Sequence, residues 1–270
     1  MGRILYKYLD AQGCASMLAN KNLQFTNATK LNDPFDCHPS LFDFSNAPVN
    51  EYNWPPADFL RAKGKTDMEN LRNSAWICSL SKIHDSLLMW AYYGNHYGAC
   101  IGLDMEKTNK NLSKIHCSIY TGAIEVEVQY RNTIEKPDYF HSSYGVYTYL
   151  LSTKAKEWEH EQEVRLLLID PTPAGLSNHP CFAPMALPYE PENDGEIIDW
   201  KEVRAYPHIG GECFESLYLG IKMKPKHRDK IMDYARQCNP NIKIYQMIVD
   251  PNAFRLKGKL LEPRSTERND

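Results

Sequence analysis

The chain has 270 residues and a formal net charge of −3, and 43% of its residues are hydrophobic and 24% charged. This length suffices for one large domain, and the composition is that of a folded globular protein, which excludes a wholly disordered chain. A near-neutral total gives no sign of an obligate nucleic-acid binder, although a local basic patch can be concealed in it.

The cysteines and the opening residues indicate a reducing, cytoplasmic location. The eight cysteines are scattered and form no C-x-x-C pair, which favours buried free thiols over a disulfide framework. The first residues lack the apolar region of a signal peptide, and no apolar run is long enough to cross a bilayer. We therefore expect a cytoplasmic protein with no membrane partner.

The first part of the chain predicts short strands and helices joined by an ordered loop. Residues 4–8 are expected to form a strand, 10–18 a helix capped by Asp10, and 23–26 a second strand. Residues 32–34, Asn-Asp-Pro, predict a turn, because Asx side chains bond nearby backbone groups and proline fixes φ.

The next part predicts a surface insertion followed by regular elements. Residues 39–73 are irregular, with a charged segment that could be helical from Pro56. A strand is expected over 76–81, a helix from Asp85 to Gly94, and a strand over 99–103.

The second half predicts more strands, two helices and a second insertion. Residues 115–130 favour β structure, 139–156 are expected to be helical, and a strand should start at Glu161. A second surface insertion is expected near 170–196, and the last elements are a strand over 215–221, a helix over 225–238, a strand over 242–249 and a polar tail over 261–270. Short strands with long loops favour a single α+β domain over residues 1–260 rather than a doubly wound parallel sheet.

The most informative stretch lies between residues 154 and 170. Alternation places Glu161, Glu163 and Arg165 on one side of the expected strand and apolar residues on the other. Same-side residues of a strand lie roughly 6 to 7 Å apart, so two carboxylates and one cation could share a small ligand. A solvated strand face is the alternative interpretation, and it is the commoner one for such a pattern.

Several common motifs do not occur in this sequence. It contains no G-x-x-x-x-G-K-[ST], no G-x-G-x-x-G after a strand and no G-x-S-x-G. His160 and Glu161 begin an H-E-x-x-H match, but Val164 occupies the second histidine position. We therefore predict no P-loop, dinucleotide-binding or hydrolase site of these types, and no metal site.

A basic segment lies between residues 222 and 236. Its cationic residues are Lys222, Lys224, Lys226, Arg228, Lys230 and Arg236. Such a run usually forms a solvated helix face, and contact with phosphates is the alternative.

Four stretches resemble a widespread bacterial domain family of unknown function. They are L-Q-F-T-N-A-T-K-L-N-D-P-F-D-C (23–37), C-S-L-S (78–81), L-M-W-A-Y-Y-G-N-H-Y-G-A-C-I-G-L-D (88–104) and K-x-x-x-W-x-x-E-x-E-x-R (154–165). That family more distantly resembles the ADP-ribosyltransferase superfamily. The opening L-Y-K-Y is also similar to the start of transferases that modify nucleic acids and of related toxins. The resemblance implies an α+β fold with an ADP-ribosyltransferase-like split antiparallel β core, peripheral helices and long loops.

The resemblance also implies roles for particular residues. Glu163 matches the catalytic glutamate and Glu161 the one that positions the acceptor nucleophile. Lys7 departs from the family, because many members have there a histidine that bonds the adenosine-side ribose of NAD. The implied cofactor-binding residues are Lys7, Tyr6, Asn27, Asn32, Ser79, Ser81, Tyr93, Tyr97 and Arg165.

Most of these residues have an expected part in the NAD site. The S-x-S strand would shape the nicotinamide pocket, and Tyr93 or Tyr97 would supply an aromatic ring for stacking. Pyrophosphate could be held by Lys7, Lys30 or the amides of residues 27–32. Arg165 would either hold Glu163 or meet the substrate.

The expected activity is therefore NAD-dependent ADP-ribosylation, with NAD as substrate and a protein, RNA or DNA as acceptor. Cleavage of the nicotinamide N-glycosidic bond passes through an oxocarbenium-like ribose, which a carboxylate stabilises. A bacterial toxin or antiphage defence effector is the implied context, and an antitoxin or regulatory protein could be a further partner. Two alternatives stay open: an NAD glycohydrolase, and a catalytically silent nucleotide-sensing or interaction module, which the Lys7 departure favours.

Overall fold

A ten-stranded, mostly antiparallel sheet forms the centre of the computed structural model, which describes residues 2–52, 54–114, 116–117, 120–142, 145–169 and 204–261. Its strands are β1 (Ile4–Leu9), β2 (Phe25–Asn27), β3 (Ala75–Ser81), β4 (Ala99–Asp104), β7 (Ile124–Glu127), β10 (Glu163–Ile169), β11 (Arg204–Ala205), β12 (Phe214–Leu219), β13 (Lys243–Val249) and β14 (Leu256–Leu260). The path runs β11-β2-β3-β1-β4-β12-β13-β14, and β10 joins it by pairing with both β3 and β7. The predicted α+β class is confirmed. The insertion expected near 170–196 and the tail after residue 261 lie outside the described residues.

Two small sheets and six α-helices complete the described part of the chain. The small sheets pair β5 (His116–Cys117) with β6 (Tyr120–Thr121) and β8 (Gln129–Arg131) with β9 (Thr153–Ala155). The helices are α1 (Ala11–Asn20), α2 (Ala57–Ser74), α3 (Leu87–Gly94), α4 (Met105–Leu112), α5 (Val146–Ser152) and α7 (Pro225–Cys238). Short 3₁₀ turns are η1 (Ala28–Lys30), η2 (Pro39–Leu41), η3 (Lys156–Glu161) and η6 (Gly211–Cys213). None of these helices has the length and apolar character needed to span a membrane.

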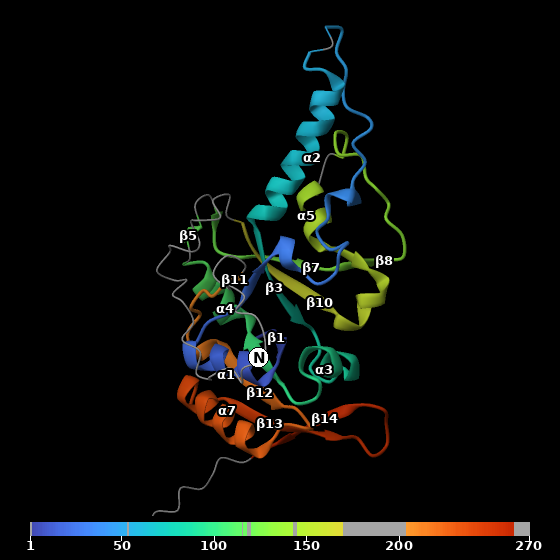
Figure 1. Cartoon of the computed structure of the whole chain (residues 1–270). Helices are drawn as coiled ribbons and strands as arrows, with labels where there is room; N and C mark the ends of the chain where they lie inside the picture. Colours follow the sequence, from blue (N-terminus) through green and yellow to red (C-terminus); the bar gives the residue numbers. More distant parts are fainter. Residues whose placement is uncertain are drawn as a thin grey trace, which may run out of the picture.

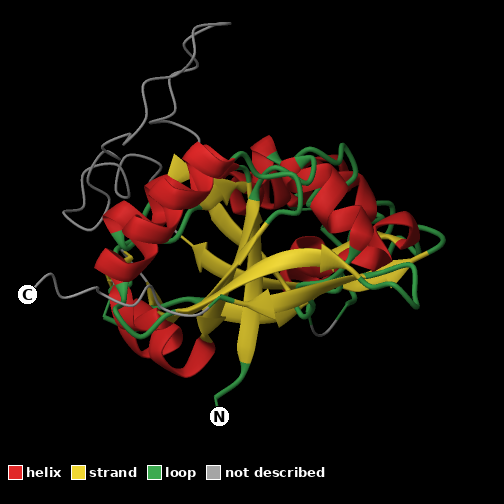
Figure 2. Cartoon of the chain, turned by 90° about the horizontal axis from the view of Figure 1, so that it is seen from below, coloured by secondary structure: helices red, strands yellow, loops and turns green. Residues whose placement is uncertain are grey.

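Helices cover both faces of the sheet, as Figures 1 and 2 show. On one face, α1 and α7 bury Leu18 and Ile231 against sheet residues such as Ile101 and Leu217. On the other face, α3 buries Trp90 against residues of β1, β4, β12, β13 and β14. The helix α2 projects away from the rest of the molecule (Figure 1), and its buried residues are Gly64 and Met68. The helix expected from Pro56 is thus present, and it ends at Ser74, one residue beyond the insertion predicted over 39–73.

One edge of β3 is shared by two strands that leave an opening between them. β2 pairs with Trp76 and Ile77 at the start of β3, whereas β1 pairs with Ser81 at its end. No described residue of β1 or β2 is in register with the three residues 78–80. The Lys7 ammonium reaches into this opening and donates to the Ser79 carbonyl at 3.0 Å. A backbone acceptor that a neighbouring strand would otherwise satisfy is thereby bonded by a side chain.

Two expectations about the middle of the chain are wrong in their extent. The helix expected over 139–156 is confined to α5, because Gly145 precedes it with φ +87° and residues 153–155 pair with β8 instead. The strand expected from Glu161 begins only at Glu163, because Glu161 ends η3 and Gln162 adopts a left-handed φ of 44°. Glu161 and Glu163 are therefore not neighbours on one strand face.

Candidate functional site

Five buried ionisable side chains form one network, which we name the charge cluster: Asp36, Lys154, Glu161, Glu163 and Arg165. Each is at most 7% exposed. They come from four places in the fold, namely the loop after η1, β9, the end of η3, and β10. A solvated strand face is therefore the wrong interpretation of the glutamates and the arginine.

Glu163 is held on both carboxylate oxygens by cations. Arg165 Nε donates to Oε1 at 2.9 Å, and Lys154 Nζ and Arg165 Nη2 donate to Oε2 at 3.1 and 3.2 Å. Desolvation acts to raise the pKa of Glu163, but the charges of Arg165 and Lys154, with a Ser79 hydrogen bond, outweigh it and lower the pKa to about 2. The carboxylate is therefore ionised at neutral pH despite its burial.

Arg165 connects β10 to a loop far away in sequence. Its Nη1 and Nη2 donate to the two carboxylate oxygens of Asp36 at 2.8 and 2.6 Å, and Nη1 also donates to the Leu151 carbonyl at 2.8 Å. The loop that carries Asp36 is ordered by Asp33, whose side chain accepts from the Phe35 amide at 2.9 Å. Such a two-pronged ion pair fixes both partners in direction as well as distance. Asp36 thus limits the directions in which Arg165 can present its guanidinium to Glu163.

Glu161 connects the charge cluster to the molecular surface. Its carboxylate accepts from Lys154 Nζ and from the Tyr93 hydroxyl, both at 2.5 Å. The Glu161 carbonyl accepts from Ser81 Oγ at 2.7 Å. Burial and the adjacent Glu161 charge raise the pKa of Tyr93, so its hydroxyl stays a donor. Tyr93 is itself 37% exposed and stands between Glu161 and solvent.

The residues predicted on four separate segments meet at this cluster. Arg165 and Glu163 lie directly opposite Ser79 and Ser81 in the β10–β3 register. Lys7 reaches the same place from β1 through the Ser79 carbonyl, and Tyr93 reaches it from α3. Six predicted residues are thereby brought together with Lys7: Ser79, Ser81, Tyr93, Glu161, Glu163 and Arg165.

Other predicted residues lie apart from the cluster. Asn27 caps η1 and donates to the Asn73 carbonyl at 2.8 Å, beside the start of β3 rather than its serine end. Asn32 is exposed, and Tyr97 is 46% exposed beyond the end of α3. The expectation that Asn27, Asn32 and Tyr97 line the same site is not supported by any contact with the cluster.

Tyr6 lies next to the cluster but makes other contacts. It is in register with Ser81, which places it within two strands of Glu163. Its ring packs against His84 and Tyr218, with centroid distances of 5.0 and 5.9 Å. The side chain therefore belongs to an aromatic row that crosses β1 and β12.

Sequence reasoning missed two members of the cluster, Asp36 and Lys154. Both lie in stretches that carry the family resemblance, Asp36 in N-D-P-F-D and Lys154 at the start of K-x-x-x-W. Lys154 Nζ also lies 4.9 Å from the centroid of the Trp158 ring, which explains the spacing between these two residues. The Asp36–Arg165 pair joins segments 129 positions apart, and Lys154, seven residues before Glu161, lies on a different element, so no helix or strand periodicity reveals either contact.

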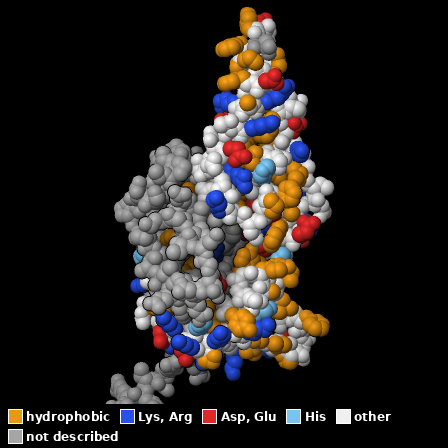
Figure 3. Space-filling view, in the orientation of Figure 1, with side chains coloured by type: hydrophobic (Ala, Val, Ile, Leu, Met, Phe, Trp, Pro, Cys, Tyr) orange, Lys and Arg blue, Asp and Glu red, His pale blue; other side chains and the backbone are white. Residues whose placement is uncertain are grey.

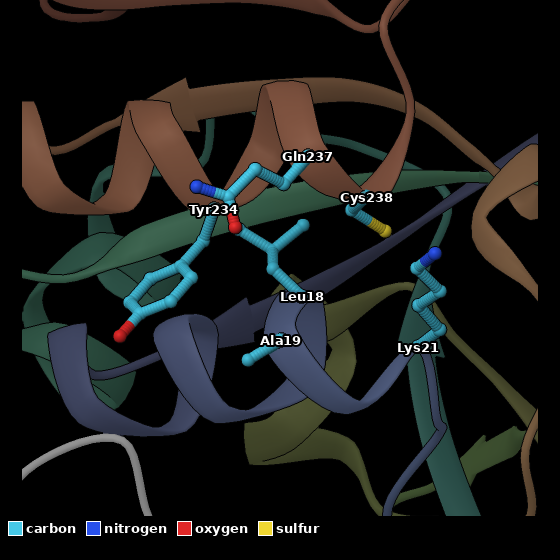
Figure 4. A pocket seen from close by; sticks show the side chains of 6 residues that line it. All are labelled: Leu18, Ala19, Lys21, Tyr234, Gln237 and Cys238. Atoms are coloured by element: carbon cyan, nitrogen blue, oxygen red, sulfur yellow. The ribbon is translucent and has the colours of Figure 1, made fainter.

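A cavity elsewhere in the fold contains none of the predicted site residues. It has a volume of about 360 Å³ and lies between α1 and α7, lined by Leu18, Ala19, Lys21, Tyr234, Gln237 and Cys238 (Figure 4). Burial raises the pKa of Cys238 to about 12, so its thiol is not a nucleophile at neutral pH. Within the described residues, no group of three or more His, Cys, Asp or Glu is placed to hold a metal ion.

Stability should depend on pH through Glu163. Its folded-state pKa of about 2 lies below the ordinary 4.5, so the ionised form stabilises the fold above pH 4.5, and this contribution is lost as pH falls from 4.5 toward 2. We expect the loss to be on the order of 3 kcal/mol. Urea midpoints of the wild type and Glu163→Gln between pH 7 and pH 2.5 measure it. The urea midpoint of the variant should fall less steeply with decreasing pH than that of the wild type. Equal falls in the two proteins would contradict the assignment of this pH dependence to Glu163.

One comparison with known proteins finds a match. The family model described as "Protein of unknown function (DUF2971)" matches residues 89–166, a stretch that contains Tyr93 and four of the five members of the charge cluster. This agrees with the resemblance to a domain family of unknown function. No curated protein and no solved structure matches the chain.

Proposed function

We propose that the chain is an ADP-ribosyltransferase that uses NAD as substrate and Glu163 as its essential carboxylate. The observation that supports this most is the meeting of Lys7, Ser79, Tyr93 and Glu163 from four separate elements. Along one edge of β3 the pairing partner changes from β2 to β1 at the level of Ser79, and we interpret this change as the counterpart of the split β core that the resemblance implies.

The electrostatics suit cleavage of an N-glycosidic bond. As the bond between ribose C1′ and nicotinamide breaks, nicotinamide leaves with the bonding electron pair and positive charge develops on the ribose. A carboxylate that Arg165 and Lys154 keep ionised and oriented needs no reorganisation to stabilise that charge. The acceptor then forms the new bond at C1′ and releases its proton to water. Glu161 would orient the acceptor.

Binding of NAD requires a local rearrangement, because Glu163 is 3% exposed. Two contacts can open without breaking the ion pairs of Glu163. One is the hydrogen bond from Tyr93 to Glu161, and the other is that from Lys7 to the Ser79 carbonyl. We assign these two side chains the movement that admits the dinucleotide.

A catalytically silent module is the second candidate, and one observation favours it. Both oxygens of Glu163 are occupied by Arg165 and Lys154, so the glutamate is fully engaged without a ligand. In that case the cluster only ties the loop after η1 to β9 and β10.

A labelling assay distinguishes the candidates. The protein and its Glu163→Gln variant are incubated with adenylate-labelled NAD and bacterial extract, and macromolecular label and free nicotinamide are measured. Labelling of macromolecules by the wild type but not by the variant supports transfer. Release of free nicotinamide without labelled macromolecules supports hydrolysis. No turnover and no NAD binding by calorimetry would overturn the proposal and leave the silent module.

A further inference from the structure

The positive charges of the chain are concentrated at its C-terminal end. Residues 204–261 contain eleven Lys and Arg but five Asp and Glu, a net charge of +6, whereas the whole chain carries −3. The rest of the chain is therefore strongly acidic. Such a separation of charge produces a local positive field that the total conceals.

Five exposed lysines of this segment form what we name the lysine cluster: Lys222, Lys224, Lys226, Lys257 and Lys259. None of them forms a salt bridge with another described residue, although Lys243 and Arg255 of the same segment pair with Glu215 and Asp250. Lys and Arg side chains gather at the lower end of the view in Figure 3, where Figure 1 places α7, β13 and β14.

The topology brings the lysines around the start of α7 close to those of β14. β12 and β13 are parallel, so α7, which joins them, runs back and begins near the ends of both strands. β14 starts at that same end, because Leu256 is in register with Val249. Lys257 and Lys259 are opposite Ile248 and Gln246, on the sheet face that α7 covers. The lysines before and within α7 therefore lie at the same end of the sheet as those of β14.

Exposed aromatic rings continue from the lysine cluster toward the charge cluster. The Lys222 amide donates to the His96 carbonyl at 2.9 Å, which fixes the lysine-bearing loop against the end of α3. That end presents Tyr97, 46% exposed, and Tyr92, 64% exposed. Tyr93, between them in sequence, donates to Glu161. Individual contacts thus link the loop of Lys222 to the end of α3, and α3 to the charge cluster and to His160, whose ring lies 5.6 Å from that of Tyr92.

We propose that the lysine cluster, Tyr92 and Tyr97 form a binding surface for single-stranded nucleic acid, which presents its bases to the charge cluster. Lysines neutralise successive phosphates, and exposed rings stack on bases that are not paired in a duplex. An acidic protein would complement the charge of the lysines, but it would offer no bases on which the flat rings of Tyr92 and Tyr97 could stack. The role of the strand as ADP-ribose acceptor rests on the proposed function, whereas its binding does not.

The test measures binding of fluorescent 20-nucleotide RNA and DNA strands by anisotropy over a range of salt concentrations, without NAD. The variant replaces Lys222, Lys224 and Lys226 by Gln, and the matched control replaces Lys63, Lys65 and Lys136, exposed lysines outside the basic segment. Loss of three phosphate contacts should weaken binding on the order of a hundredfold near 0.1 M salt and reduce the slope of log K against log salt by about 2. Tyr97→Ala should weaken binding by about fivefold to a hundredfold.

The outcomes separate the two proposals. Absence of salt-dependent binding by the wild type, or equal weakening in both triple variants, overturns the nucleic-acid surface. Transfer of label from NAD to extract proteins with no strand binding also overturns it and leaves the proposed function intact. Strand binding that the lysine variant loses, without any reaction of NAD, supports the surface and contradicts the proposed function. Circular dichroism of each variant confirms that it is folded.

Discussion

Replacing Arg165 by Met should destabilise the protein by about 3 to 5 kcal/mol, because removal of one partner leaves buried charge uncompensated. Arg165 is fully buried and provides both bonds to Asp36 and two of the three cationic bonds to Glu163. Without it, three buried carboxylates share Lys154 alone. The free energy of unfolding from urea titration at pH 7 measures the effect.

Two further variants make the Arg165 prediction specific. Arg61→Met removes an exposed ion pair with Asp58 and should cost less than about 1 kcal/mol. Adding Asp36→Asn to Arg165→Met removes one of the buried carboxylates that the loss of Arg165 leaves without its cation. The double variant should therefore recover part of the lost stability. An Arg165→Met protein as stable as the Arg61→Met control would show that the cluster is not buried as described.

Under the proposed function, Glu163→Gln should reduce ADP-ribosyl transfer by at least about a hundredfold, because a pre-organised charge opposite a developing charge contributes that much or more. The substitution keeps the shape of the side chain but removes its charge. The charge cluster contains three carboxylates and two cations, so the change makes it neutral instead of negative. We therefore expect a smaller loss of stability than for Arg165→Met, and a folded protein for the assay.

Glu161→Gln is the matched control for Glu163→Gln. It removes one charge from the same cluster, but we assign Glu161 to the acceptor rather than to the ribose. The variant should still release nicotinamide from NAD while transfer to the acceptor falls. Initial rates of nicotinamide release and of acceptor labelling measure the two steps separately. Full activity in Glu163→Gln, or equal losses of both steps in the two variants, would contradict these roles.

Local signals in the sequence predicted many elements well. Pro225 at the first turn marks the start of α7, which covers 225–238 as expected. Asp10 caps α1 through the Gly13 amide at 2.6 Å, and Asn95 ends α3 in the left-handed conformation. These signals act within a few residues of the position they determine, so they can be recognised without knowledge of the fold.

Elements that depend on distant partners were missed or misplaced. β14 contains a central glycine and forms as a strand because it pairs with β13, whose partner residues the sequence does not identify. α4 was not expected either, although Asp104 caps it and Met105 and Leu112 supply its buried face. In that case a local signal was present, and asparagines of low helix propensity obscured it.

By itself the sequence determined the α+β class, most element boundaries near caps and turns, and the spacing that singled out Glu161, Glu163 and Arg165. The tertiary structure alone decided that these charges are buried, that Glu161 is not on the strand, and that Asp36 and Lys154 neutralise them. The reason is physical: a strand pattern specifies which side chains share a face, whereas what covers that face depends on other elements, here the loop of Asp36, more than a hundred residues away, and the separate strand β9 that carries Lys154. Asp36 and Arg165 are 129 positions apart, and their ion pair exists because the fold brings them together.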